Sequence, residues 1–393
     1  MKMNLFMVLW FSYHSPSVPH TKAYNTLSIL FDIIIKIGEK QHMKRSAYIE
    51  FLRFFVAICI FMLHTLELLI GVNKHCAYVL AVMVEFFFIL SGFLMMRHIM
   101  ENPDEKEDAF VYTFNKAKSV FLPVFIVHII HFIVTCIAGR VSSLWEIVES
   151  FWHYRWNFLL LQCAGFTKDP QFNGDYLVGP VWYISALLIA VLVLYTPAKR
   201  WTKTFVQFIC PLLVLTVYGY ISQQYGHIDV GNELVAGIVL LAVLRALAGI
   251  CAGCMTYYFT KKIVDGEWKV TKLYCVISVL ASLMVPLCII YAFIGKDDNS
   301  IFMIIPFALV IIDAFAEITP IARFFNNTFV GCFNFLGKIS LYVYLTHFAV
   351  LIAALYFMQV ISLAVKIVIC SVVVAIYSLC LYEIDRWISK KNL

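Results

Sequence analysis

Long apolar segments alternate with short polar connections along most of the chain. A helix needs about 20 predominantly apolar residues to cross the ~30 Å hydrocarbon core of a bilayer. Segments of this kind occur at 49–70, 77–96, 119–139, 178–196, 204–221, 234–258, 272–294, 301–319, 335–356 and 361–382. A single apolar segment in lipid satisfies its backbone hydrogen bonds only as a helix. The pattern therefore predicts an all-α polytopic membrane protein, a bundle of about ten transmembrane helices.

Two regions do not fit this simple bundle. Residues 1–42 contain short apolar runs, broken by Pro16 and Pro19, that are too short to span. We expect them to form a separate N-terminal extension, with residues 43–393 as one membrane domain and Met43 as an alternative start. The long outer segment 140–177 is rich in aromatic residues, and we expect 144–162 to lie as an interfacial helix. Its aromatic side chains suit either a membrane-interface belt or a wall for stacking carbohydrate.

Composition supports lipid as the main solvent of this chain. Hydrophobic residues make up 62% and charged residues only 14% of the 393 positions, and the mean hydropathy is +0.85. A soluble domain has about 45–50% apolar and about 25% charged residues. Most of the 12 cysteines, Cys251 and Cys254 included, fall in apolar segments, which indicates packing rather than disulfides or metal. The net charge of +6 is spread over short loops, which argues against nucleic-acid binding.

The basic residues set the expected orientation. With a cytoplasmic N-terminus, the inner connections carry 20 Lys and Arg residues and the outer connections carry five. Cytoplasmic loops are enriched in Lys and Arg. Both termini are therefore predicted to be cytoplasmic.

The first predicted span carries the most informative ionisable residues. Arg53 and His64 are 11 residues apart, which is about three helical turns and about 16 Å of rise, so both point the same way. Glu67 follows His64 by three residues and is predicted to contact its ring. An ionisable group at membrane depth is costly and marks a candidate functional site. One face thus combines a cation on the inner side with a histidine base further along.

Other spans contain Glu85, Arg245, Asp313, Glu317 and His347. Arg245 is predicted near the middle of the membrane, where it needs an acidic partner. His128 and His131 are one turn apart, but no third ligand accompanies them, so no metal site is expected.

Four segments carry a recognisable combination of residues in a fixed order. They are Arg53-x10-His64, Glu85-Phe-Phe-Phe-Ile-Leu-Ser91-Gly92-Phe93, Val181-Trp182-Tyr183-Ile184-Ser185, and Phe335-Leu-Gly337-Lys-Ile-Ser340-Leu-Tyr-Val-Tyr344-Leu-Thr-His347. This order resembles the acyltransferase-3 family of integral-membrane O-acyltransferases over roughly residues 44–385. The chain departs from the family at Val120, where an arginine is common before Pro123, and no SGNH-type hydrolase domain is appended.

The resemblance implies a reaction and a set of roles. The donor would be a cytosolic acyl-CoA, with acetyl-CoA as the first candidate. It would be a co-substrate, and no bound cofactor or metal would be needed. The acceptor would be a hydroxyl of a cell-surface or exported glycan, or of its lipid-linked precursor, at a bacterial inner membrane. His64 would be the general base with Glu67 beside it, and Arg53, Lys116, Lys118 and Arg245 would bind the donor. Further candidates are Glu85, Ser91, Trp182, Tyr183, Ser340, Tyr344 and His347.

Two other classes of function stay open from the residues alone. Buried Arg, His, Asp and Glu also suit a proton-coupled secondary transporter, although no internal repeat is visible. A non-catalytic binding or assembly subunit is the third alternative, and it would tolerate His64→Ala.

Overall fold

The computed structural model describes residues 43–71, 74–103, 105–140, 143–166, 177–231, 233–237, 239–295 and 298–391. The chain divides into two units at Lys44 and Arg45, and the second unit contains all the elements discussed below. The prediction for residues 1–42 lies outside the described residues.

Nine helical segments in the described part of the chain are long and apolar enough to span a membrane, and a bent pair supplies a tenth. This confirms the predicted all-α polytopic membrane protein. The first three spans are α3 (Ala47–Thr65) with η1 (Leu66–Ile70), α4 (Lys74–Leu80) with α5 (Met83–Glu101), and α6 (Ala109–Thr135) with η2 (Cys136–Arg140). The next four spans are η3 (Gly179–Val181) with α9 (Trp182–Arg200); α10 (Thr202–Thr204), η4 (Phe205–Ile209) and α11 (Cys210–Tyr225) together; α12 (Leu241–Val264); and α13 (Lys272–Ile294). The bent pair consists of η5 (Ile301–Met303) and α14 (Ile304–Ala316), followed by α15 (Pro320–Asn327), and the last two spans are α16 (Val330–Phe357) and α17 (Leu363–Lys391).

Side-chain caps fix where several helices begin. Ser46, Asp108 and Thr271 each accept a hydrogen bond from the backbone N–H three residues later, at the starts of α3, α6 and α13. Such caps satisfy backbone donors that have no partner within the helix. The cap at Asp108 starts α6 ten residues before the predicted span. Lys116 and Lys118 therefore lie on a helix and not in a loop.

The predicted start of the sixth span is wrong. Residues Leu234–Val235 (β1) and Val239–Leu240 (β2) pair as a short antiparallel hairpin, and α12 begins only at Leu241. Ala236 and Gly237 both have positive φ, at 53° and 69°, which turns the chain back on itself. An apolar run alone does not reveal this turn.

The eighth span, predicted as one helix over 301–319, is broken, so Asp313 and Glu317 do not lie on one continuous helix. Glu317 adopts a left-handed conformation with φ 51° and ends α14, and α15 leaves at 58°. Asp313 accepts hydrogen bonds from the backbone N–H and hydroxyl of Thr319 at 2.8 and 2.6 Å. Asp313 thus stabilises the break and is not the partner of Arg245.

The outer segment forms two short helices where one interfacial helix was predicted. α7 (Leu144–His153) buries none of its side chains, whereas α8 (Arg155–Phe158) turns inward and packs Phe158 against Phe125 and Phe132 of α6. Beyond α8, Leu160 has φ 60° and the backbone N–H of Cys163 donates to Ser185 Oγ at 3.1 Å. The tip of this segment, residues 159–161, therefore enters the bundle.

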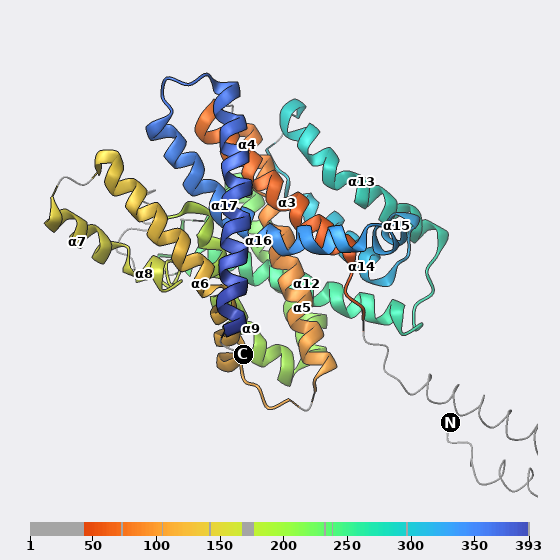
Figure 1. Ribbon diagram of the computed structural model, residues 1–393. Helices are drawn as coiled ribbons and strands as arrows, with labels where there is room; N and C mark the ends of the chain where they lie inside the picture. The colour runs from red at the N-terminus through yellow and green to blue at the C-terminus, as the bar shows by residue number, and fades with distance from the viewer. Residues whose placement is uncertain are drawn as a thin grey trace, which may run out of the picture. The chain divides into compact units, whose positions relative to one another are not determined.

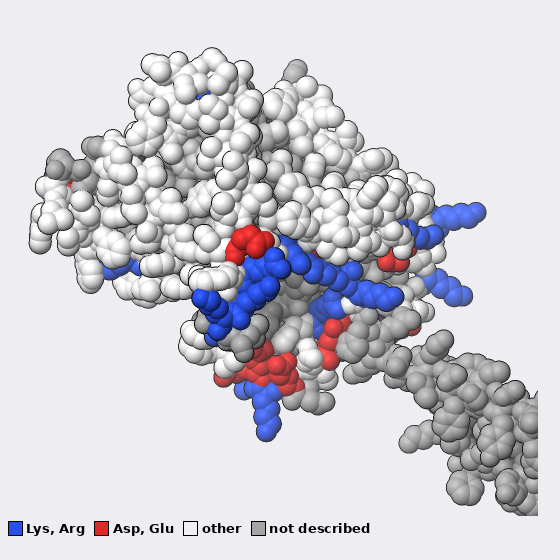
Figure 2. Space-filling view, viewed as in Figure 1, with Lys and Arg blue, Asp and Glu red and all other residues white. Residues whose placement is uncertain are grey.

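The centre of the unit is built on two helix pairs, α5 with α12 and α3 with α16 (Figure 1). The spans containing α5 and α12 are 83% and 78% buried, against 28% for α13 and 17% for α17. The two peripheral helices therefore present most of their apolar surface outward. In the view of Figure 2, Lys and Arg gather toward one end, and the broad surface above them carries almost no charge. That distribution is typical of a membrane-embedded surface.

Two glycines set the distance between α5 and α12. A Cβ at Gly92 would lie 2.0 Å from the carbonyl oxygen of Ile250, and one at Gly253 would lie 1.9 Å from that of Ile89. Small residues let transmembrane helices approach to backbone contact, which is where much of their packing energy arises.

We expect Gly253→Ala to lower the thermal midpoint of the detergent-purified protein, because the added methyl group meets backbone and not a movable side chain. Overpacking of this kind costs about 1–3 kcal/mol. Gly219→Ala on α11 is the matched control, since nothing lies within 4 Å of its Cβ position. Equal midpoints for the two variants would contradict the close crossing.

Candidate active site

Six of the predicted site residues line one cavity of about 250 Å³ between α3, α5, α6, α9 and α16. We call this cavity the chamber. The six are Arg53, Ser91, Lys116, Tyr183, Ser340 and Tyr344. Its remaining walls are mostly apolar side chains such as Phe87 and Leu187. With Ser119, which also lines it, the chamber thus places two cations and five hydroxyl groups in a largely apolar setting.

Arg53 is held at the chamber by a buried carboxylate. Glu50 binds Arg53 Nη1 at 2.9 Å and Arg45 Nε at 2.8 Å. Glu50 is 6% exposed and lies where a side chain at position 337 would be, so Gly337 on α16 leaves the room it occupies. Arg53 itself stays about one third exposed, at 32%. The guanidinium is therefore oriented but still accessible from the chamber.

His64 occupies the other end of α3. Its Nδ1 lies 2.8 Å from a carboxylate oxygen of Glu67, so the predicted contact is present. The imidazole stacks on His347 of α16, with ring centroids 5.4 Å apart and planes 17° from parallel. Phe348 packs edge-on against the same ring. With Nδ1 directed at Glu67, the second ring nitrogen, Nε2, is the one left for a substrate.

Tyr344 connects the chamber to this histidine pair. Its ring lines the chamber, and its centroid is 5.9 Å from that of Tyr183 and 6.0 Å from that of His347. Its hydroxyl donates to the carbonyl of Pro180, which fixes the ring. His347 is fully buried and bonds the carbonyl of Val343 through Nδ1 at 3.1 Å. A row of side chains therefore runs from Arg53 and Tyr344, which both line the chamber, to His347 and His64, which lie beyond it.

Arg245 and Glu85 form a buried ion pair beside this row. Arg245 Nε and Nη2 lie 2.9 and 2.8 Å from Glu85 Oε1, and Tyr218 donates its hydroxyl to the same carboxylate. Arg245 also donates to the carbonyl of Val230 at 2.6 Å and packs on the ring of Trp182. The expected acidic partner of Arg245 is therefore Glu85. Neither Arg245 nor Trp182 lines the chamber, so the structure separates both from Arg53 and Lys116.

Sequence reasoning missed Asp229, which lies in the connection between α11 and β1. Its side chain is accessible, and its charge interacts with those of Glu67, His64, Arg245 and His227. Partial desolvation raises the pKa of Asp229, and the carboxylate of Glu67 raises it further, whereas the three basic groups oppose the rise. Next to it, Val230 is tied to Arg245. A carboxylate in a loop carries no signal in a hydropathy pattern.

Among the described residues, one cluster brings together three side chains of the types that bind metal ions. Nε2 of His98 lies 2.8 Å from Glu107 and 3.3 Å from Glu105, in the connection between α5 and α6. These hydrogen-bonded contacts account for the arrangement without an ion, and Asn115 also donates to Glu107 at 3.1 Å. His128 instead packs its ring against Phe158. The absence of a metal stays a prediction.

Comparison with known proteins bears on the class of this site. The model of the acyltransferase-3 family, described as an acyltransferase domain, matches residues 46–383. No curated protein and no solved structure matches the chain. The match includes all elements of the chamber and the His64–Glu67 pair, and it favours an enzyme over a transporter or an inert subunit. The chain belongs to the acyltransferase-3 family and is a multi-pass membrane acyltransferase.

Proposed function

We propose that the protein transfers an acyl group from cytosolic acyl-CoA to a hydroxyl of a cell-surface or exported glycan, or of its lipid-linked precursor. Acetyl is the first candidate for the acyl group. The observation that supports this most is the row from Arg53 and Lys116 to His64. It combines two cations that line an apolar cavity with an oriented imidazole that lies beyond the cavity, past Tyr344 and His347.

The donor would enter from the side where α3 begins, which the basic loops predict to be cytoplasmic. Coenzyme A carries several phosphate charges, and Arg53 and Lys116 are the two cations of the chamber. The guanidinium of Arg53 presents a planar pair of donors, held in place by Glu50. The neutral pantetheine arm then suits the apolar part of the chamber, which leads toward Tyr344 and the histidine pair.

In the transfer step, His64 Nε2 takes the proton of the acceptor hydroxyl while Glu67 holds Nδ1. The hydroxyl oxygen bonds to the thioester carbonyl carbon, and the carbon–sulfur bond breaks. The coenzyme A thiolate leaves and takes back the proton from Nε2, so atoms and charge balance. No bound cofactor is needed for this step.

The carbonyl oxygen gains negative charge during the step and needs a hydrogen-bond donor. Arg245, Tyr344 and Ser91 are the candidates for this donor. Arg245 is already bound to Glu85, and Tyr344 already donates to the carbonyl of Pro180. Ser91 lines the chamber, with its hydroxyl 3.5 Å from that of Tyr183, at the limit of hydrogen bonding. We therefore assign the donor role to Ser91, supported by Tyr183.

The acceptor would approach from the opposite side, where Glu67 and Asp229 lie. Carboxylates accept hydrogen bonds from hydroxyl groups, and a saccharide offers many. Asp229 is accessible and is positioned through the bond between Val230 and Arg245. The buried Glu85–Arg245 pair thereby supports the acceptor side without touching either substrate.

His64→Ala is expected to lower the rate of acyl transfer at least about 100-fold, because general-base catalysis contributes about 10²–10⁴. Glu67→Gln should cause a smaller loss with an unchanged KM for the donor, since it disturbs only the orientation of His64. The measurement is coenzyme A release and transfer of labelled acetyl to envelope glycans by protein in nanodiscs. A folded His64→Ala variant with undiminished transfer would remove His64 from the mechanism.

Arg53→Lys and Lys116→Gln are expected to raise the KM for acetyl-CoA by about 10-fold to 100-fold, because each weakens a charge-assisted hydrogen bond. Arg53→Lys retains a cation beside Glu50, so the buried carboxylate keeps a partner. Lys262→Ala is the control, since Lys262 pairs with Glu267 outside the chamber. Equal KM values for all variants would place the donor elsewhere, and no use of acetyl-CoA or succinyl-CoA by wild type would reject the coenzyme A mechanism.

A further inference from the structure

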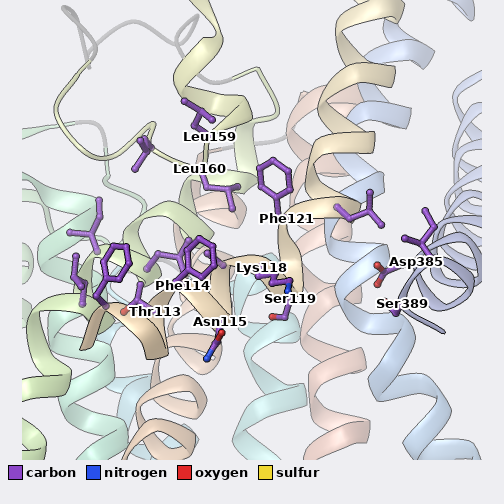
Figure 3. Close-up of a pocket in the computed structure, with 18 residues that line it drawn as sticks. Thr113, Phe114, Asn115, Lys118, Ser119, Phe121, Leu159, Leu160, Asp385 and Ser389 are labelled. Atoms are coloured by element: carbon purple, nitrogen blue, oxygen red, sulfur yellow. The ribbon is translucent and has the colours of Figure 1, made fainter. Parts of the chain in front are cut away.

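A second, larger cavity of about 1010 Å³ lies on the other side of α6 from the chamber, between α6, α9, α17 and the tip 159–161. We call it the lateral groove. Figure 3 shows Phe114 and Phe121 of α6 at the groove, with Leu159 and Leu160 above Phe114. Its walls are mostly aromatic and aliphatic, and Leu192 of α9 lies 43% exposed along them. Apolar walls of this extent suit hydrocarbon.

The groove has one polar end. Lys118, Asn115 and Ser119 of α6 lie there, and Asp385 and Ser389 of α17 face them across the groove (Figure 3). The carboxylate of Asp385 accepts a hydrogen bond from Tyr342 at 2.6 Å. In the described part of the chain, no carboxylate pairs with Lys118. Lys118 therefore forms no ion pair there, although the carboxylate of Asp385 lies on the opposite wall, where Tyr342 holds it. An unpaired cation near hydrocarbon is costly.

The end of α17 indicates the depth at which the polar end of the groove lies in the membrane. Its last turn carries Lys390 and Lys391, and the ammonium group of Lys391 lies 3.6 Å from the ring centroid of Trp387. Basic residues together with Trp mark the headgroup level on the cytoplasmic side. The far end is closed by the tip, where Leu160 is held at φ 60°, an unusual conformation for a bulky residue. The groove thus runs from headgroup level into the hydrocarbon of one leaflet.

We propose that the lateral groove binds one anionic phospholipid of the inner leaflet, with its phosphate at Lys118 and its acyl chains along Phe121, Leu160 and Leu192. Basic pockets between transmembrane helices on the cytoplasmic side recognise anionic headgroups. In this setting, Arg386 is paired with Glu383, and Lys390 and Lys391 add positive charge that exceeds the single carboxylate of Asp385. A zwitterionic headgroup would bring an additional cation into it, whereas an anionic one adds none.

Such a lipid would complete the wall of the chamber. Ser119 and Leu188 line both cavities, so the groove and the chamber adjoin at these side chains. The span containing α17 is 17% buried and borders the groove. The lipid therefore fills the space between α17 and the α6–α9 pair and stabilises the chamber from outside.

The test uses the full chain in detergent with added phosphatidylglycerol or phosphatidylcholine, and reads lipid binding by native mass spectrometry and the thermal midpoint. Wild type is expected to bind phosphatidylglycerol about 10-fold more tightly and to gain a higher midpoint with it. Lys118→Gln should lose this preference and Lys118→Arg should keep it. Leu192→Trp should lose binding, whereas Val193→Trp, at an exposed position of the same helix that does not line the groove, should retain it.

Equal affinity for the two phospholipids, or equal binding by the Leu192→Trp and Val193→Trp variants, would overturn the proposal. Displacement of phosphatidylglycerol by a lower concentration of a long polyprenyl monophosphate would also overturn it and assign the groove to a lipid-linked substrate. None of these readouts requires turnover, so the result does not depend on the coenzyme A mechanism.

Discussion

A charge in hydrocarbon is stable only with a partner, and this constraint shapes the centre of the molecule. The pair of Glu85 and Arg245 is almost completely buried, and each member makes a second polar contact, to Tyr218 and to the carbonyl of Val230. Removing one member of such a pair would leave an unpaired buried charge, which costs about 3–5 kcal/mol. The pair thereby joins α5, α11, α12 and the loop that carries Asp229. The close crossing of α5 and α12 at Gly92 and Gly253 brings its two members within reach.

The same constraint explains how Arg53 is held between α3 and α16. Glu50 is the counter-charge that lets Arg53 lie beside an apolar cavity, and it fits only because Gly337 has no side chain. On the same two helices, His64 stacks on His347. Tyr344 and His347 are three residues apart and therefore lie on one face of α16. The packing of these two helices thus positions both Arg53 and His64.

Hydropathy predicted the ten spans because crossing a bilayer imposes a length and an apolar composition on each segment. It did not predict the hairpin at 234–240, the break at Glu317 or the inward turn after Tyr154. These features depend on single residues with positive φ, such as Ala236, Glu317 and Leu160, and on contacts from distant segments. Helical spacing likewise predicted that Glu67 meets His64, which is a local contact. Asp229 escaped notice because its position depends on Arg245, 16 residues later in the chain and on another element.

Lys116 and Lys118 show the limit of assigning a function from sequence spacing alone. Both were expected to bind the donor from one loop, but α6 begins early and rotates them by about 200° relative to each other. One therefore lines the chamber and the other the lateral groove, with Ser119 on the boundary. Helix α6 consequently acts as a wall with a cation on each side. The charge that reaches the chamber suits a soluble phosphate donor, whereas the charge that reaches the groove suits the headgroup of a lipid.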